Sequence, residues 1–352
     1  MPNAGARIDR TGSFSGMTRR GVLTGGTWCI DRNLLVDRWP ALNGRADILE
    51  AKRSGGGSGC NMAIDLRKLD QDLAVATITL VGDDDDGRFL AGLADAHGID
   101  RTQMQVTGEA ATNYTHAYSD RSTGQRTHIS YFGTSRWLTP DHFDFASAQH
   151  AWLHLGLPGV HERMDGPWAG EANGWVAVLK KARAAGLRTN LELASLAPER
   201  LAALVRPCLP HLDLLIVNDH EIGGIAGIET VAGGETDPEA CIAAARTALA
   251  LGRCDLVAVH FPRGAIVVGR DGSVTTRPSV NVPHEEIAGA NGAGDAFAAG
   301  FLYGIHEGWS VHRALTLAHA VAAASLRAIS TTDAIEPWSQ CLALADSWGW
   351  RE

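Results

Sequence analysis

The chain has little basic character and no long apolar run, and each absence excludes a broad class of function. Its 352 residues carry a formal net charge of −9, and no run of Lys or Arg is longer than two. A nucleic-acid-binding protein usually presents a basic patch, so we expect no nucleic-acid partner. No apolar stretch approaches the roughly 20 residues of a membrane-spanning helix, so we expect no membrane partner.

Paired cysteine motifs are also missing. The chain has no Cys-x-x-Cys pair, and the spacing of its cysteines fits no zinc site. The six cysteines are Cys29, Cys60, Cys208, Cys241, Cys254 and Cys341. We therefore expect free, buried thiols in a reducing compartment, which favours a cytoplasmic protein.

The N-terminal segment allows two interpretations. Residues 18–23, with Arg19 and Arg20, resemble the start of a twin-arginine export signal. The apolar stretch after them is short, however, and it reaches Asp31 without a small-residue cleavage site. We therefore interpret residues 1–20 as a disordered leader and residues 21–30 as the first buried strand.

Beyond this point, short apolar runs alternate with stretches of helical periodicity. Strands buried on both faces appear as continuous apolar runs, so the alternation predicts an α/β fold with a doubly wound, mainly parallel sheet and helices on both faces. The expected strands span residues 21–30, 73–81, 151–157, 187–193, 212–217 and 254–261. The expected helices span residues 58–69, 87–97, 173–185, 198–206 and 238–251.

Two segments interrupt the alternation. Residues 32–55 show no helical pattern, and residues 111–134 alternate around a turn at 122–124, which predicts a β-hairpin. We expect the two segments to pair as a small β-sheet lid inserted into one domain that spans residues 21–345. The unpaired strand edges of such a lid also suggest a homodimer.

A glycine-rich loop carries the strongest chemical signal. Gly292, Ala293 and Gly294 are small enough for several backbone N–H groups to point one way, and an apolar helix follows them. The positive end of that helix adds to these donors, so an anion such as a phosphate should bind there. Asp295 lies in the first helical turn, where it could take a proton from a hydroxyl that attacks a phosphoryl group. Taken alone, the loop is described equally well as an Asp cap behind a glycine turn.

Further motifs, in a fixed order along the chain, decide between these two interpretations. Residues 289–301 and 56–63 resemble the two signatures of the ribokinase (PfkB carbohydrate kinase) family. The remaining matches are Asp31 at a strand end, the Gly-x-Asp-x-x-Gly turn of residues 82–87, and the Asn-x-x-Glu of Asn218 and Glu221. The resemblance covers about residues 21 to 330 and implies a ribokinase-like fold and an ATP-dependent kinase.

The resemblance also implies a role for each matching residue. For catalysis these are Asp295 as the base, with Gly292, Ala293 and Gly294 as the backbone anion hole. The positions implied for the substrate are Asp31, Gly56, Gly57 and Asn61, and those implied for the nucleotide are Asn218, Arg263, Gly264 and His319. Asn218 and Glu221 match residues that hold Mg²⁺ through water, which suits an ion that keeps most of its hydration shell.

Two departures from the family pattern concern ions and the nucleotide. The family usually has Asp-Thr before its Gly-Ala-Gly-Asp element, where this chain has Gly289, Ala290 and Asn291. This difference argues against a monovalent-cation site. Phe261 stands where a glycine normally borders the nucleotide phosphates, and Arg263 could add positive charge beside it.

The acceptor is the least defined part of this hypothesis. We expect transfer of the ATP γ-phosphoryl group to a hydroxyl of a sugar or sugar-like small molecule. Trp28, Tyr131 and Phe132 near the expected site could stack on a sugar or a base, so a nucleoside kinase is the first alternative. A catalytically silent sugar or nucleotide sensor is the second, because the segments 259–264 and 289–291 depart from the family pattern.

Overall fold

The computed structural model describes residues 19–123 and 125–352. The expected disordered leader therefore lies almost entirely outside the described residues. Within them, a nine-stranded sheet has the order β15-β14-β13-β10-β9-β8-β1-β4-β5, and only β14 and β15 run antiparallel to their neighbours. These strands are β1 (Val22–Gly26), β4 (Val75–Gly82), β5 (Asp100–Thr107), β8 (Trp152–Gly156), β9 (Arg188–Leu191), β10 (Leu214–Asn218), β13 (Leu256–Phe261), β14 (Gly264–Gly269) and β15 (Val274–Pro278).

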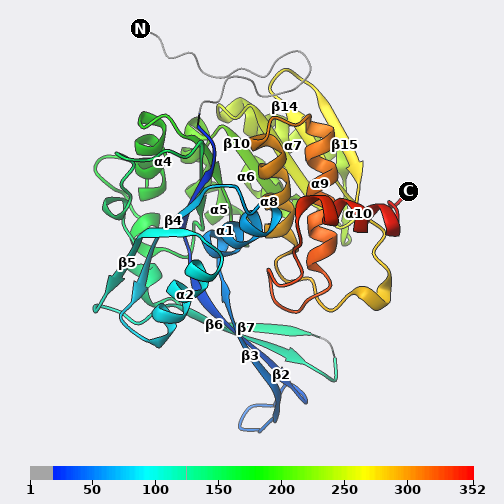
Figure 1. Ribbon diagram of the computed structural model, residues 1–352. Helices are drawn as coiled ribbons and strands as arrows, with labels where there is room; N and C mark the ends of the chain where they lie inside the picture. The colour runs from blue at the N-terminus through cyan, green and yellow to red at the C-terminus, as the bar shows by residue number, and fades with distance from the viewer. Residues whose placement is uncertain (1–18, 124) are drawn as a thin grey trace.

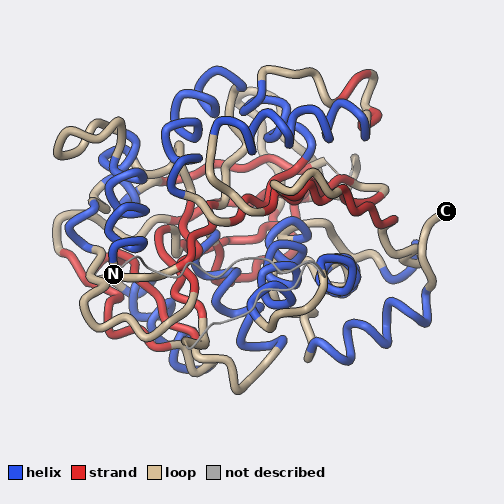
Figure 2. Tube along the Cα trace, turned by 90° about the horizontal axis from the view of Figure 1, so that it is seen from above, coloured by secondary structure: helices blue, strands red, loops and turns tan. Residues whose placement is uncertain are grey.

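Helices cover both faces of this sheet, as Figures 1 and 2 show. One face carries α1 (Ser58–Leu69), α2 (Asp85–Ala96), α8 (Ala293–His306), α9 (Val311–Ser325) and α10 (Trp338–Trp348). The other carries α3 (Glu162–Asp165), α4 (Gly174–Ala184), α5 (Pro198–Val205), α6 (Asp219–Ala226) and α7 (Pro238–Leu251). Successive strand side chains point to opposite faces, so Val22 joins one apolar core and Leu23 the other. The expected doubly wound α/β fold is confirmed.

Short elements fill the connections. They are the strands β11 (Val231–Ala232) and β12 (Glu235–Thr236), and the 3₁₀ turns η1 (Gly133–Arg136), η2 (Pro140–His142), η3 (Arg206–His211) and η4 (His284–Glu286). None of the described helices combines the length and the apolar character needed to cross a bilayer. All six cysteines are buried and free, as expected.

A second, four-stranded sheet projects from the core (Figure 1). Its order is β3-β2-β6-β7, with β2 (Cys29–Val36), β3 (Ile48–Gly56), β6 (Tyr114–Asp120) and β7 (Arg126–Tyr131). These strands come from the two segments that interrupt the α/β alternation, and we call this sheet the lid.

The expectation of one strand over residues 21–30 is wrong. The chain leaves the main sheet at Gly26 and enters the lid at Cys29. Gly26 has φ 112°, and a Cβ there would lie 1.6 Å from the carbonyl oxygen of Gly156. Only glycine allows this bend and this close approach to β8, so one apolar run serves two sheets.

Candidate active site

The first turn of α8 forms the centre of the site. Gly292 is its N-cap residue, with φ 75° and ψ 3°, and a Cβ there would lie 2.7 to 2.9 Å from atoms of Thr331. Ala293 begins the helix, and Asp295 is the acidic residue of its first turn. The first N–H groups of a helix have no partner inside it, so this end can bind an anion. The structure thus brings the four residues expected for catalysis into one turn.

Two cavities meet at this turn. Ala293 and Gly294 line the first, of about 420 Å³, which we call the apolar cavity. Asp295 lines the second, of about 600 Å³, which we call the lid cavity because residues of β2, β6 and β7 form part of its wall. A group bound in one cavity can therefore reach a group bound in the other past the N-terminus of α8.

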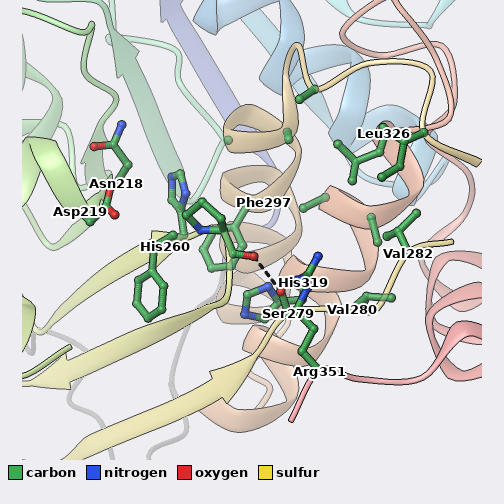
Figure 3. A pocket seen from close by; sticks show the side chains of 18 of the residues that line it. Asn218, Asp219, His260, Ser279, Val280, Val282, Phe297, His319, Leu326 and Arg351 are labelled. Atoms are coloured by element: carbon green, nitrogen blue, oxygen red, sulfur yellow. Dashed lines mark hydrogen bonds between the residues drawn. The ribbon is translucent and has the colours of Figure 1, made fainter. Parts of the chain in front are cut away.

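Aromatic and aliphatic side chains dominate the apolar cavity (Figure 3). The ring of Phe297 packs between the imidazoles of His260 and His319, with centroids 4.9 and 5.1 Å away. Burial lowers the pKa of His319 to about 3, so this ring is neutral. The walls also include Asn218, Phe261, Val280, Ile287, Leu326 and, from the C-terminal segment, Arg351. A largely apolar cavity with a few polar groups is typical of a small-molecule binding site.

Two residues expected at the nucleotide are not brought into this cavity. The β13–β14 register pairs Phe261 with Gly264, which leaves Pro262 and Arg263 as the hairpin turn. Arg263 is exposed there, Gly264 is buried in the sheet, and Phe261 and Pro262 line the cavity instead. The tight turn places Arg263 beside the lining residue Pro262 and Gly264 in the sheet, and a nucleotide contact at these two positions stays a prediction.

Only some of the residues expected at the substrate line the lid cavity. Asp31 and Gly57 line it together with Asp295. Burial, with Asp295 nearby, raises the pKa of Asp31 to about 7. Gly56 lies directly against this carboxylate, since a Cβ there would be 2.1 Å from Asp31 Oδ2. The remaining walls come from residues that the sequence motifs did not indicate, among them Asn113, Tyr114, His128, Ser130 and Ser195.

Asn61 contacts Asp295. Its Nδ2 donates to Asp295 Oδ2 at 2.6 Å, and its Oδ1 accepts from Thr331 Oγ1 at 2.8 Å. Asn61 lies inside α1, whose N-cap residue is Gly57. The side chain orients the Asp295 carboxylate.

A second carboxylate next to Asp295 was missed at the sequence level. Glu192 follows β9, and its side chain is 15% exposed. Burial, then the adjacent Glu192, raises the pKa of Asp295 well above its usual value. Burial also raises the pKa of Glu192, to about 7, although its hydrogen bond with Asp295 opposes this rise. Glu192 belongs to no motif that we recognised, because nothing in the local sequence indicates which residue will face α8.

Asn218 and Glu221 cap α6 reciprocally. Asn218 Oδ1 accepts from the N–H of Glu221 at 2.8 Å, and Glu221 Oε2 accepts from the N–H of Asn218 at 3.0 Å. Asn218 lines the apolar cavity. Burial raises the pKa of Glu221 to about 7, so its ionised form is costly without a cation.

Comparison with known proteins agrees with this geometry. The model of the pfkB family carbohydrate kinases matches residues 22–338. An ATP-dependent ribose-1-phosphate kinase from Halopiger xanaduensis is 27% identical over 89% of this chain and 96% of its own length. A Schizosaccharomyces pombe adenosine kinase is 31% identical over 35% of this chain and 36% of its own.

Solved structures show the same fold. An Arabidopsis thaliana ribokinase complexed with ribose and ATP has a TM-score of 0.76 at 19% identity, covering 93% of this chain and 99% of its own. A Thermotoga maritima ribokinase has a TM-score of 0.74 at 20% identity, with the same coverage. The chain belongs to the pfkB family of carbohydrate kinases, and it is an ATP-dependent kinase of sugars or sugar-like molecules.

Proposed function

We propose that Asp295 is the base that deprotonates the acceptor hydroxyl while the γ-phosphoryl group of Mg-ATP is transferred to it. The observation that carries this proposal is that one helical turn lines both cavities, with Ala293 and Gly294 facing the apolar cavity and Asp295 facing the lid cavity. ATP in the apolar cavity and the acceptor in the lid cavity then meet at the N-terminus of α8.

The reaction follows from what each group can do. Asp295 takes the proton of the acceptor hydroxyl, and the hydroxyl oxygen attacks the γ-phosphorus as ADP leaves. The N–H groups of Ala293, Gly294 and Asp295 stabilise charge on the transferred group, and Asp31 and Gly57 hold other hydroxyls of the acceptor. Closure of the lid would keep water from competing with the acceptor.

Asn218 and Glu221 are the residues that we assign to Mg²⁺. A carboxylate and an amide oxygen are ligands that Mg²⁺ accepts, directly or through its water shell. The buried Glu221 fits this role because a divalent cation would offset the cost of ionising it. The ion supplies charge neutralisation of the phosphates when it is bound. We assign no residues to a monovalent cation.

A nucleoside acceptor is the second candidate, and one feature favours it. Tyr131 and Phe132 line the lid cavity, and they are 44% and 37% exposed. The ring centroids of Tyr131 and Tyr114 are 5.3 Å apart. Such rings can stack on a base. Within the described part of the chain, no Lys or Arg lines this cavity, so a neutral acceptor fits it better than a phosphorylated sugar.

The test is ADP release from Mg-ATP across a panel of sugars, sugar phosphates and nucleosides. Asp295→Asn should lower turnover by about 10² to 10⁴, the usual contribution of a general base, and leave ATP binding intact. Turnover should also stop when EDTA removes Mg²⁺. A fully active Asp295→Asn enzyme would refute the proposed base. Ligand binding without turnover on any acceptor would favour the silent sensor instead.

The setting of the reaction is part of the proposal. We place it in the cytoplasm, where ATP and reduced thiols coexist, with a small-molecule acceptor as partner. We also propose a homodimer formed through the lid, since β3 and β7 are its unpaired edges and carry the exposed apolar residues Ile48, Leu49 and Ile129.

A further inference from the structure

We propose that Arg351 binds the nucleotide, with its guanidinium plane stacked on the purine base of ATP in the apolar cavity. Arg351 belongs to no sequence motif described above, and it lies outside residues 22–338, which the family model matches. The inference rests on the proposed placement of ATP in the apolar cavity. It adds a residue that sets the affinity for the nucleotide.

Contacts with β15 and the residues after it hold the segment that carries Arg351. The N–H group of Arg351 donates to the carbonyl oxygen of Ser279 at 2.9 Å. Val280 and Trp350 form an antiparallel β-bridge, and the guanidinium carbon of Arg277 on β15 lies 3.9 Å from the centroid of the Trp350 ring. The backbone of Arg351 is therefore fixed beside the chain that follows β15.

Arg351 lies across the apolar cavity from the residues that we assign to the phosphates and to Mg²⁺. Asn218 pairs with His260 between β10 and β13, and a Cβ at Gly294 would lie 3.4 Å from the His260 ring, so Asn218 and the first turn of α8 share one side. Figure 3 shows Arg351 on the other side of the cavity from Asn218. With its phosphates at the first turn of α8, ATP extends its base toward Arg351.

The guanidinium group of Arg351 is available to a ligand. In the described part of the chain, Arg351 is the one Lys or Arg that lines the apolar cavity. Its guanidinium group has no hydrogen bond or ion pair with another described residue, and Arg351 is exposed. Guanidinium planes stack on aromatic faces, and nucleic-acid bases are bound on them in the same way. A purine base in this cavity therefore has a planar, charged partner in Arg351.

The position of Arg351 separates nucleotide binding from the chemical step. The base of ATP lies at the end of the nucleotide away from the transferred phosphoryl group, so its contact with Arg351 is the same before and during the reaction. An interaction that is equally strong in the ground state and in the transition state lowers KM without changing kcat. Loss of the Arg351 side chain should therefore raise KM for ATP and leave kcat and the KM of the acceptor unchanged.

The test is calorimetric titration of the full chain with Mg-ATP and with Mg-ADP, for the wild type and for Arg351→Ala. The Kd should rise about threefold to thirtyfold, the range that a guanidinium on an aromatic ring contributes. The rise should be the same for ATP and ADP, because both carry the same base. An unchanged Kd, or a rise for ATP alone, would overturn the inference.

Two further Arg variants show what the side chain contributes. Arg246→Ala is the matched control, because Arg246 is exposed on α7 and lines neither cavity; its Kd should equal that of the wild type. Arg351→Lys keeps the charge and loses the plane, so its Kd should lie closer to that of Arg351→Ala than to that of the wild type. A Kd closer to the wild type would refute stacking, since a phosphate contact needs only the charge.

A variant that fills the apolar cavity separates this inference from the placement of ATP. Ala322 lines the cavity from α9, so Ala322→Trp should weaken ATP binding whatever the role of Arg351. If Ala322→Trp does not fold, Val282→Trp at another wall gives the same test. Weakened binding in this variant beside an unchanged Kd in Arg351→Ala removes only the role of Arg351, whereas unchanged binding in both removes the placement of ATP as well.

Discussion

Replacing Gly292, the N-cap residue of α8, tests how the loop of residues 292–295 supports catalysis. In Gly292→Ala the new Cβ would lie 2.7 Å from Thr331 Cβ, 2.8 Å from its Cα and 2.9 Å from its carbonyl oxygen. Ordinary carbon contacts lie at about 3.5 to 4.0 Å, so the backbone of Thr331 must move by roughly half an ångström or more. Such overpacking costs about 1 to 3 kcal/mol. An alanine at φ 75° adds about 1 to 2 kcal/mol of left-handed strain.

The total, about 2 to 5 kcal/mol, translates into a shift in Tm. An unfolding entropy of about 2.1 cal/mol/K per residue predicts a fall of roughly 3 to 7 °C for a chain of this length. Catalysis should suffer as well, because Thr331 Oγ1 holds Asn61, which in turn holds Asp295. We expect kcat to fall by about tenfold or more, since small displacements of a base are costly.

The assay is calorimetry together with steady-state kinetics, and Gly272→Ala is the matched control. Gly272 lies in the β14–β15 turn with φ 89°, and a Cβ there would meet no atom within 4 Å. The Gly272→Ala variant therefore has the backbone strain without the clash. Its Tm should fall by only about 1 to 3 °C, and its kcat should be unchanged. Equal losses in Tm for the two variants, or an unchanged kcat in Gly292→Ala, would refute this reasoning.

Two other predictions follow from buried charge and from exposed edges. Asp65 is fully buried on α1, neither of its carboxylate oxygens has a hydrogen-bond partner among the described residues, and burial raises its pKa well above the usual value. Unfolding then releases a proton above about pH 4, so wild-type stability should fall as the pH rises. Asp65→Ala should therefore stabilise the fold by about 1 to 3 kcal/mol at pH 7 and by less near pH 4, as thermal melts would show; a gain that does not depend on pH would contradict this. For the lid dimer, sedimentation velocity should show a dimer that Ile129→Lys dissociates, because Ile129 on β7 is 55% exposed; a wild-type monomer at micromolar concentration would count against it.

The sequence predicted those helices whose start residues and apolar periodicity lie within the helix itself. The helix expected at 58–69 is α1 and the one at 238–251 is α7, because a glycine or an Asp-Pro start and an apolar stripe mark both. The antiparallel edge strand β15 was missed because its residues alternate between exposed and half-buried, and it carries little apolar signal. The helices α9 and α10 were not proposed either, although their apolar residues complete one core.

The residues of the candidate site also differ in whether the sequence alone indicated them. The loop of Gly292 to Asp295 was expected from the residues themselves, because backbone-permissive residues and a carboxylate at a helix start have chemical meaning within a few positions. Asp31 and Gly57 were expected only from the family resemblance, and both line the lid cavity with Asp295. A two-residue hairpin turn, which the sequence did not indicate, decided that Phe261 and Pro262 line the apolar cavity in place of Arg263 and Gly264.

The sequence by itself determined the family, the alternating α/β order and the identity of the expected base, since these depend on residue type and short spacing. Only the tertiary structure decided what surrounds that base. Glu192 follows β9, His154 lies on β8 and Asn61 lies in α1, far apart along the chain. Asn61 donates to Asp295 and His154 contacts Glu192 because the packing of the layers brings these segments together beside α8. Contacts between distant segments depend on how the layers pack, and that packing is a property of the whole core.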